Sequence, residues 1–174
     1  MQNKMKKSFS TLSAFFLISY IITGCASVRY ITPQVVKNEL TLNNLSANKT
    51  NVIVTDYRLS TYTDDVCTSI QKQLIQALSQ DAALSDVTYM LTVDVIEYKS
   101  FFTHNEWHGE MKLKVILKNA DDKLLGSWDI YETTKQANLW GYATAKQVSQ
   151  EVYEKAMSYL ISVLNNEVTL DVHQ

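Results

Sequence analysis

The sequence predicts an α+β fold: a two-layer sandwich in which two helices lie on one face of a mostly antiparallel sheet. Three stretches, residues 87–98, 111–117 and 124–130, alternate between apolar and polar side chains, as half-buried strands do. Two others, residues 63–83 and 144–163, repeat apolar side chains at the spacing of an amphipathic helix. With a further strand before the first helix, the order is β-α-β-β-β-α, which leaves the second face of the sheet to water or to a partner.

The first strand and the first helix follow one another closely. The strand is expected at residues 52–59, where β-branched and aromatic side chains dominate. Residues 63–65, Thr-Asp-Asp, then have the composition of a helix N-cap followed by acidic residues in the first turn. The apolar face of the helix behind them consists of Val66, Ile70, Leu74, Ala77 and Leu78.

The later elements carry their own local signals. The alternation of residues 87–98 changes phase at Val95 and Ile96, which predicts a bulge or a bend in that strand. Residues 119–123 carry turn-forming side chains between the third and fourth strands. Thr144 and Gln147 match a capping box at the start of the last helix. The apolar faces of all these elements predict one shared core, in which we expect to find Val93, Val115, Ile130, Leu74, Val152 and Leu160.

The first 24 residues predict a secretory signal peptide. Three lysines precede a mostly apolar run at residues 9–22, and no acidic residue occurs before Glu39. A membrane-spanning helix needs about 20 consecutive apolar residues, whereas serine and threonine interrupt this shorter run. We therefore expect a cleaved signal rather than a helical anchor.

The apolar run ends in Ile22-Thr23-Gly24-Cys25, which resembles the lipobox of bacterial lipoproteins. That resemblance implies that Cys25 carries a thioether-linked diacylglycerol and becomes the first mature residue. Several acyl chains hold a protein to a membrane firmly where a single chain holds it reversibly. Ala26 stands where an aspartate usually signals retention in the inner membrane, so the resemblance favours the outer membrane with the body in the periplasm. An ordinary secretory signal that ends near a cysteine by chance is the alternative.

The part of the chain after the signal is acidic and has the size of one domain. Of the 16 basic side chains three lie in the signal, whereas all 18 acidic side chains follow it. This balance argues against nucleic acid as a partner and against electrostatic docking to anionic lipid. Residues 25–50 are polar and contain the only proline, so we expect a tether with a short strand near residues 35–36, followed by the domain at 51–174.

The chain has two cysteines, and a lipid on Cys25 would leave Cys67 without a disulfide partner. Cys67 lies on the apolar face of the first helix, where a small buried hydrophobe is the usual role. Asp64 and Asp65 lie nearby and would disfavour a thiolate. We therefore expect a buried, unreactive thiol.

Residues 101–110, FFTHNEWHGE, contain the candidate metal ligands. His104, Glu106, His108 and Glu110 are evenly spaced and would share one face of an extended chain. Because a strand advances about 3.3 Å per residue, four such side chains cannot surround one ion. We expect the solvated rim of a hairpin, with no metal site and no cofactor, and the chain contains none of the common catalytic motifs.

Aromatic side chains in two connections are the candidate contact residues. Phe101, Phe102 and Trp107 lie in the segment above, and Trp140 and Tyr142 precede the last helix. Aromatics at a loop tip either contact a partner or a lipid, or form a lid over the end of a sheet. The sequence leaves both alternatives open.

Three segments cover most of the predicted strands and the last helix: TYMLTVDVIEY, MKLKVILKNADDKLLGSWDIYE and AKQVSQEVYEKAMSYLISVL. Together they resemble the YajG family of lipoproteins and, more distantly, the lipoprotein subunit of the lipopolysaccharide-assembly translocon. The resemblance covers most of the mature chain and consists of element order rather than a catalytic signature. It implies a non-catalytic lipoprotein that acts by contact with an envelope protein, as an assembly or accessory factor. The alternative is a binding module for a small envelope ligand, such as a lipid, a glycan or a peptidoglycan fragment.

Overall fold

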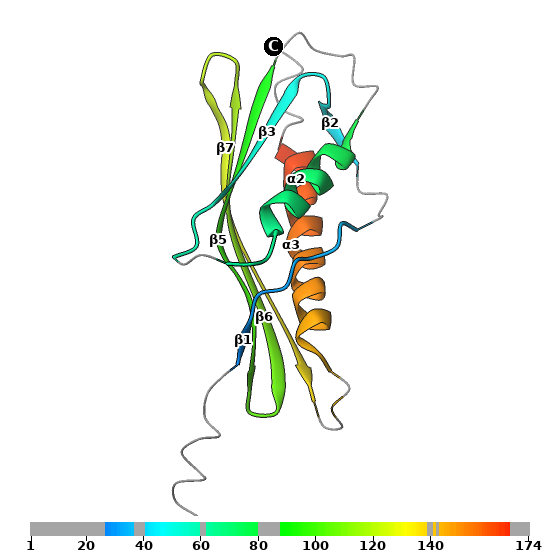
Figure 1. Ribbon diagram of the computed structural model, residues 1–174. Coiled ribbons are helices and arrows are strands. Elements are labelled where there is room, and N and C mark those ends of the chain that lie inside the picture. Colours follow the sequence, from blue (N-terminus) through cyan, green and yellow to red (C-terminus); the bar gives the residue numbers. More distant parts are fainter. Residues whose placement is uncertain are drawn as a thin grey trace, which may run out of the picture.

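A computed structural model gives the structure of the protein. It describes residues 27–36, 41–59, 62–79, 88–138, 141 and 143–167. These residues form two layers, a long twisted sheet and a layer containing helices α2 (Val66–Ala77) and α3 (Ala145–Glu167), as Figure 1 shows. The predicted α+β fold is confirmed.

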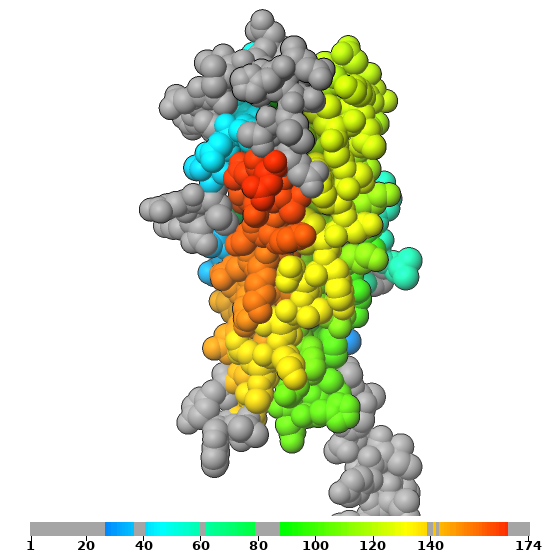
Figure 2. Space-filling model, turned by 180° about the vertical axis from the view of Figure 1, so that it is seen from behind, coloured from blue at the N-terminus to red at the C-terminus, as the bar shows by residue number. Residues whose placement is uncertain are grey.

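The main sheet is built around three long antiparallel strands. They are β5 (Tyr89–Thr103), β6 (Glu106–Asn119) and β7 (Leu124–Ala137), which follow one another as a meander. On its other side, β5 pairs in parallel with β3 (Thr50–Asp56) and, further along, antiparallel with β1 (Val28–Arg29). A separate parallel pair consists of β2 (Leu42–Ser46) and β4 (Leu78–Ser79). The helices cover one face of the main sheet, and Figure 2 shows α3 lying lengthwise along β7.

The predicted irregularity in β5 is a bulge. Val95 pairs with Leu113 and Glu97 pairs with the adjacent Lys112, so Ile96 has no partner residue on β6. Because a shift of one residue turns every later side chain to the other face of the sheet, the bulge directs Tyr98 toward the helices. Tyr98 is accordingly buried.

The predicted core is confirmed. All six residues expected there are fully buried and belong to one apolar cluster that spans the sheet and both helices. Two tyrosines complete it, and each satisfies its hydroxyl with a backbone carbonyl, as buried tyrosines must. Tyr98 donates to the Ile31 oxygen at 2.9 Å, and Tyr153 donates to the Ser69 oxygen at 3.1 Å.

The described parts of the expected tether instead pack against the domain. Residues 27–36 run from β1 across both helices, held by side chains that replace the hydrogen bonds of a sheet. Gln73 accepts from the Val36 nitrogen at 2.6 Å and donates to the Val36 oxygen at 3.1 Å, and Gln150 makes the same reciprocal pair with Gln34. The strand expected at residues 35–36 is therefore absent from this segment, and β2 further on contributes Leu42 and Leu45 to the core.

Residues 101–110, which were expected to form a connection between two strands, belong mostly to the strands themselves. β5 and β6 continue to a two-residue turn at His104 and Asn105, where φ is 49° and 60°. Tight hairpins of this kind require positive φ at both central residues, and asparagine and histidine tolerate it better than most side chains. Neither described helix has the combination of length and apolar character that crossing a membrane requires.

Candidate functional site

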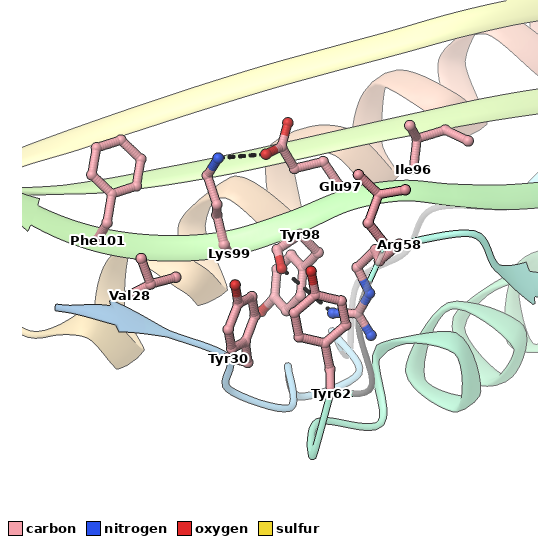
Figure 3. Close-up of a pocket in the computed structure, with 10 residues that line it drawn as sticks. Val28, Tyr30, Arg58, Tyr62, Ile96, Glu97, Tyr98, Lys99 and Phe101 are labelled. Carbon is pink, nitrogen blue, oxygen red and sulfur yellow. Dashed lines mark hydrogen bonds and ion pairs between the residues drawn. The ribbon is translucent and has the colours of Figure 1, made fainter. Parts of the chain in front are cut away.

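A pocket lies in a gap along the edge of β5. β3 pairs with β5 as far as Val95, and β1 pairs with it from Ser100, so no described strand lies beside residues 96–99 on this side. The loop after β3 and the continuation of β1 close the gap from either end. They enclose a pocket of about 410 Å³, which Figure 3 shows.

Arg58 fixes the floor of this pocket. Its side chain is 2% exposed, and its guanidinium contacts Asp56 at 2.6 Å and Asp64, which is fully buried, at 2.9 Å. A further bond at 3.4 Å reaches the backbone oxygen of Tyr98 on β5. The guanidinium carbon also lies 4.2 Å from the ring centre of Tyr62, a cation–π distance. Because a guanidinium is a rigid planar fork of donors, these contacts fix the loop after β3 against the gap in β5.

The charges around Arg58 stabilise one another. Burial alone would lower the pKa of Arg58, but the hydrogen bonds to Asp56 and Asp64 outweigh burial and raise it. The hydrogen bond from Arg58 in turn holds the pKa of Asp56 below its usual value. Arg58 is thus a structural cation rather than one presented to a ligand.

Aromatic and apolar side chains form the walls of the pocket. The rings of Tyr30 and Tyr62 lie 4.1 Å apart between centres, and burial together with the hydrogen bond to Tyr62 raises the pKa of Tyr30. Around the mouth, Val28, Leu59 and Ile96 are exposed by 41%, 104% and 37%. An apolar group from a partner would find here both a cavity and an apolar rim.

The second cation of the pocket, Lys99, is also paired. Its ammonium group bonds to Glu97 on the same strand and lies 3.0 Å from Glu110 on β6. The bond to Glu97 is the main cause of the raised pKa of Lys99. The same ammonium is 5.6 Å from the ring centre of Phe101. With both cations paired, the arrangement is suited to holding an apolar group rather than to transferring protons.

The predicted contact residues divide between two places. Phe101 lines the pocket and stacks on His108 of β6, with 5.1 Å between ring centres. Phe102 and Trp107 pair across the hairpin at 5.2 Å and belong to the opposite face of the sheet, because neighbouring residues of a strand alternate. Trp140, Tyr142 and the lipidation candidate Cys25 lie outside the described residues.

The evenly spaced histidines and glutamates do not gather. His104 is in the turn, whereas Glu106, His108 and Glu110 lie along β6 and point to its uncovered face. Glu106 lies 3.6 Å from His108 and 3.7 Å from Lys135. Among the described residues, no group of three or more potential ligands is placed to hold a metal ion.

Cys67 is half-buried rather than fully buried, and it packs against the edge of the core. Burial, with the nearby charge of Asp56 next in importance, raises the pKa of the thiol to about 11. Asp64 and Asp65, the neighbours that the sequence indicated, contribute less to this raised pKa than burial does.

Sequence reasoning missed Arg58, Tyr62 and Tyr30. The first two fall at the end of a predicted strand and just before a predicted helix, and the third falls in the expected tether. One signal was present: an arginine lies between aspartates at positions 56 and 64, close to Tyr62. That composition is typical of a fixed ion pair beside an aromatic ring, although it does not indicate which strand edge the cluster closes.

A second hollow of about 470 Å³ lies between α3 and the strands β6 and β7. Its polar groups bond to one another: Lys155 lies 2.8 Å from Glu151, which also accepts from Gln136 at 2.9 Å. The bond from Lys155 is the main cause of the lowered pKa of Glu151. This hollow lacks the apolar rim that distinguishes the pocket beside β5.

Comparison with known sequences gives no match: neither a family model nor a curated protein matches the chain. Comparison with solved structures shows the fold. Protein XCC0632 of Xanthomonas campestris, from the DUF330 family, is similar with a TM-score of 0.51 and 14% identity, over 82% of this chain and 95% of that one. At this identity the similarity concerns the fold alone.

Two more distant structures come from proteins described as lipoproteins. One, provisionally so described, is from Caulobacter crescentus, with a TM-score of 0.44 and 12% identity over 70% of this chain and 88% of that one. The other is lipoprotein GNA1162 of Neisseria meningitidis, with a TM-score of 0.35 and 11% identity over 67% and 97%. Both are too dissimilar to add to what the fold shows.

Proposed function

We propose that the protein is a lipoprotein of the outer membrane, anchored by lipid on Cys25 with its domain in the periplasm. The support is the sequence Ile22-Thr23-Gly24-Cys25 at the end of a basic and then apolar leader. In this proposal the protein acts without catalysis, by contact with another envelope protein, as an assembly or accessory factor.

The contact surface in this proposal is the pocket beside β5, and its exposed apolar rim is the observation that carries the assignment. Val28, Leu59 and Ile96 surround a cavity whose floor Arg58 holds rigid. Soluble proteins seldom expose apolar side chains together unless they bind a partner there. A rigid cavity favours binding because little conformational entropy is lost when a partner inserts an apolar side chain.

Photo-crosslinking in cells tests this assignment. A photoreactive amino acid replaces Leu59 at the rim or, in the matched control, Leu124, the first residue of β7, which is 56% exposed. We expect a discrete protein adduct from position 59 and none from position 124. Equal adducts from both positions, or none from position 59, would contradict a partner at the pocket.

A small envelope ligand is the second candidate, because the pocket volume falls within the range of small-molecule sites, about 300–1,000 Å³. The paired rings of Tyr30 and Tyr62 would suit the apolar face of a sugar or an acyl chain. The same experiment separates the two candidates: mass spectrometry of the adduct at position 59 gives either a peptide of another protein or a mass increment of a few hundred daltons, typical of small ligands.

A further inference from the structure

The described domain begins almost at the proposed lipid anchor. Val28 is the first residue of β1, and only Ala26 and Ser27 separate it from Cys25. Because a chain extends at most about 3.3–3.6 Å per residue, Cys25 lies within about 11 Å of Val28. An anchor this short cannot let the domain move far from the membrane.

The direction of β1 determines which end of the domain is near the anchor. β1 is antiparallel to β5, with Val28 opposite Phe101 and Arg29 opposite Ser100. The chain before Val28 therefore enters the sheet from the side of the turn at residues 104–105. Figure 1 shows β1 beside the half of β5 that leads to this turn. The turn begins three residues beyond Phe101, which is about 10 Å along a strand. This distance is similar to the greatest distance between Cys25 and Val28.

The side chains at this end suit the surface of a bilayer. Phe102 and Trp107 form a half-buried aromatic pair one residue inside the strand ends that meet at the turn, and the exposed His104 and Asn105 form the tip. Tryptophan is enriched where hydrocarbon meets water, because its ring is apolar and its N–H is polar. The carboxylate of Glu106, the acid nearest the tip, has Lys135 3.7 Å away, which reduces its repulsion from anionic headgroups.

We propose that the end of the β5–β6 hairpin rests on the bilayer that holds the Cys25 lipid, with the Phe102–Trp107 pair at the lipid interface. This inference rests on the proposed lipidation of Cys25. It gives the protein a fixed orientation, with the strands rising from the membrane and the turn between β6 and β7 at the far end. Since β6 has 14 residues, that turn is about 45 Å from the hairpin tip.

Quenching of tryptophan fluorescence by brominated lipid tests the orientation. The lipidated protein is reconstituted into phosphatidylethanolamine–phosphatidylglycerol vesicles containing phosphatidylcholine brominated near the carbonyl end of one acyl chain. One variant, Trp128→Phe with Trp140→Phe, retains Trp107. The matched control, Trp107→Phe with Trp140→Phe, retains Trp128, which lies opposite Val115 in the middle part of the sheet.

We expect the emission of Trp107 to fall by about half and that of Trp128 to be nearly unchanged, because quenching requires contact with the lipid interface. A flexible spacer of ten residues, glycine and serine, inserted after Ala26 is expected to abolish most of the quenching. If Trp128→Phe fails to fold, the difference between the unaltered protein and Trp107→Phe isolates the same signal.

Flotation of the vesicles separates this inference from the proposed function. Protein that does not float with the vesicles contradicts lipid anchoring at Cys25. Protein that floats with Trp107 unquenched leaves the anchor intact and overturns the membrane-facing hairpin, as a protein partner at this end would. Equal quenching with and without the spacer would show that the short connection does not hold the hairpin at the membrane, and would also overturn the argument.

Discussion

The two turns at opposite ends of β6 differ in length and in chemistry: two residues connect β5 to β6, and four connect β6 to β7. Polar side chains hold the turn between β6 and β7: the Asn119 side chain accepts from the nitrogens of Asp121 and Lys123 at 3.1 and 3.0 Å, and Lys118 pairs with Asp122 at 2.7 Å. The turn between β5 and β6 has Phe102 and Trp107 directly behind its tip. Polar contacts hold one end of the sheet, and the other end presents an amphipathic aromatic pair.

This difference shows that the two ends of the sheet are chemically distinct. A turn needs only residues that accept positive φ and satisfy its backbone groups, and asparagine and aspartate at 119–122 are sufficient for that. The aromatic residues at the other turn are more than its geometry requires. In the proposed orientation these aromatic residues, beside β1, are the ones that meet the membrane.

The largest expected effect comes from breaking the sheet that joins the two ends. Val115 is fully buried in the middle of β6, so Val115→Asp places an unpaired carboxylate in the core. Burial of such a charge costs more than the stability of an ordinary domain, about 5–15 kcal/mol, can absorb. We expect the purified variant to show no cooperative thermal transition. Lys114→Gln, on the exposed face one residue away, should melt as the unaltered protein does.

A smaller loss is expected from the pocket between the two ends. Arg58→Ala leaves the fully buried Asp64 without its cation, and removal of one partner from a buried ion pair costs about 3–5 kcal/mol. The midpoint of urea unfolding should fall accordingly, and adducts at position 59 should disappear. Lys135→Ala removes a lysine that is 69% exposed and should leave the midpoint within error. If the two variants unfold alike, Arg58 does not fix the loop.

The next effect in size is expected from Trp107→Ala, which removes one ring of the aromatic pair beside the β5–β6 turn. The half-buried ring contacts Phe102 at the end of the sheet, so its removal should cost only about 1–2 kcal/mol while removing the interfacial anchor. Thermal melting and the salt-resistant association with vesicles of the domain without its lipid are measured together, because acyl chains alone would hold the lipidated protein. Leu124→Ala at the opposite turn should change neither. A much larger loss of stability in Trp107→Ala, with unchanged association, would favour a lid over the sheet end instead.

The smallest effect is a pH dependence. The pKa of Asp56 is lowered in the folded protein, so Asp56 stabilises the fold above its unfolded pKa of about 3.8. This stabilisation is lost as the pH falls through the lower folded value. Because Asp56 is 40% exposed, water screens the interaction and the effect is modest. Unfolding titrations between about pH 2 and pH 5 should show a shallower acid decline for Asp56→Asn; an identical decline would remove Asp56 as a contributor.

The sequence predicted those parts of the fold that follow from side-chain periodicity. The bulge beside Ile96 and the core around Val115 were predictable because burial on one face of a strand imposes alternation. The segment 27–36 was not, because the side chains of Gln73 and Gln150, rather than its own propensity, hold it. The pocket was equally hidden, since Tyr30 and Tyr62 are distant in sequence and meet where β1 pairs with β5.

The most direct test of the account is metabolic labelling of Cys25→Ser with palmitate, followed by separation of inner and outer membranes. We expect the unaltered protein to incorporate label and to fractionate with the outer membrane. Cys25→Ser should incorporate none and remain uncleaved or soluble, because serine cannot form the thioether. Cys67→Ser, the matched control, should label fully, because it retains Cys25 and the lipobox-like sequence before it. Label and outer-membrane fractionation of Cys25→Ser would contradict the account.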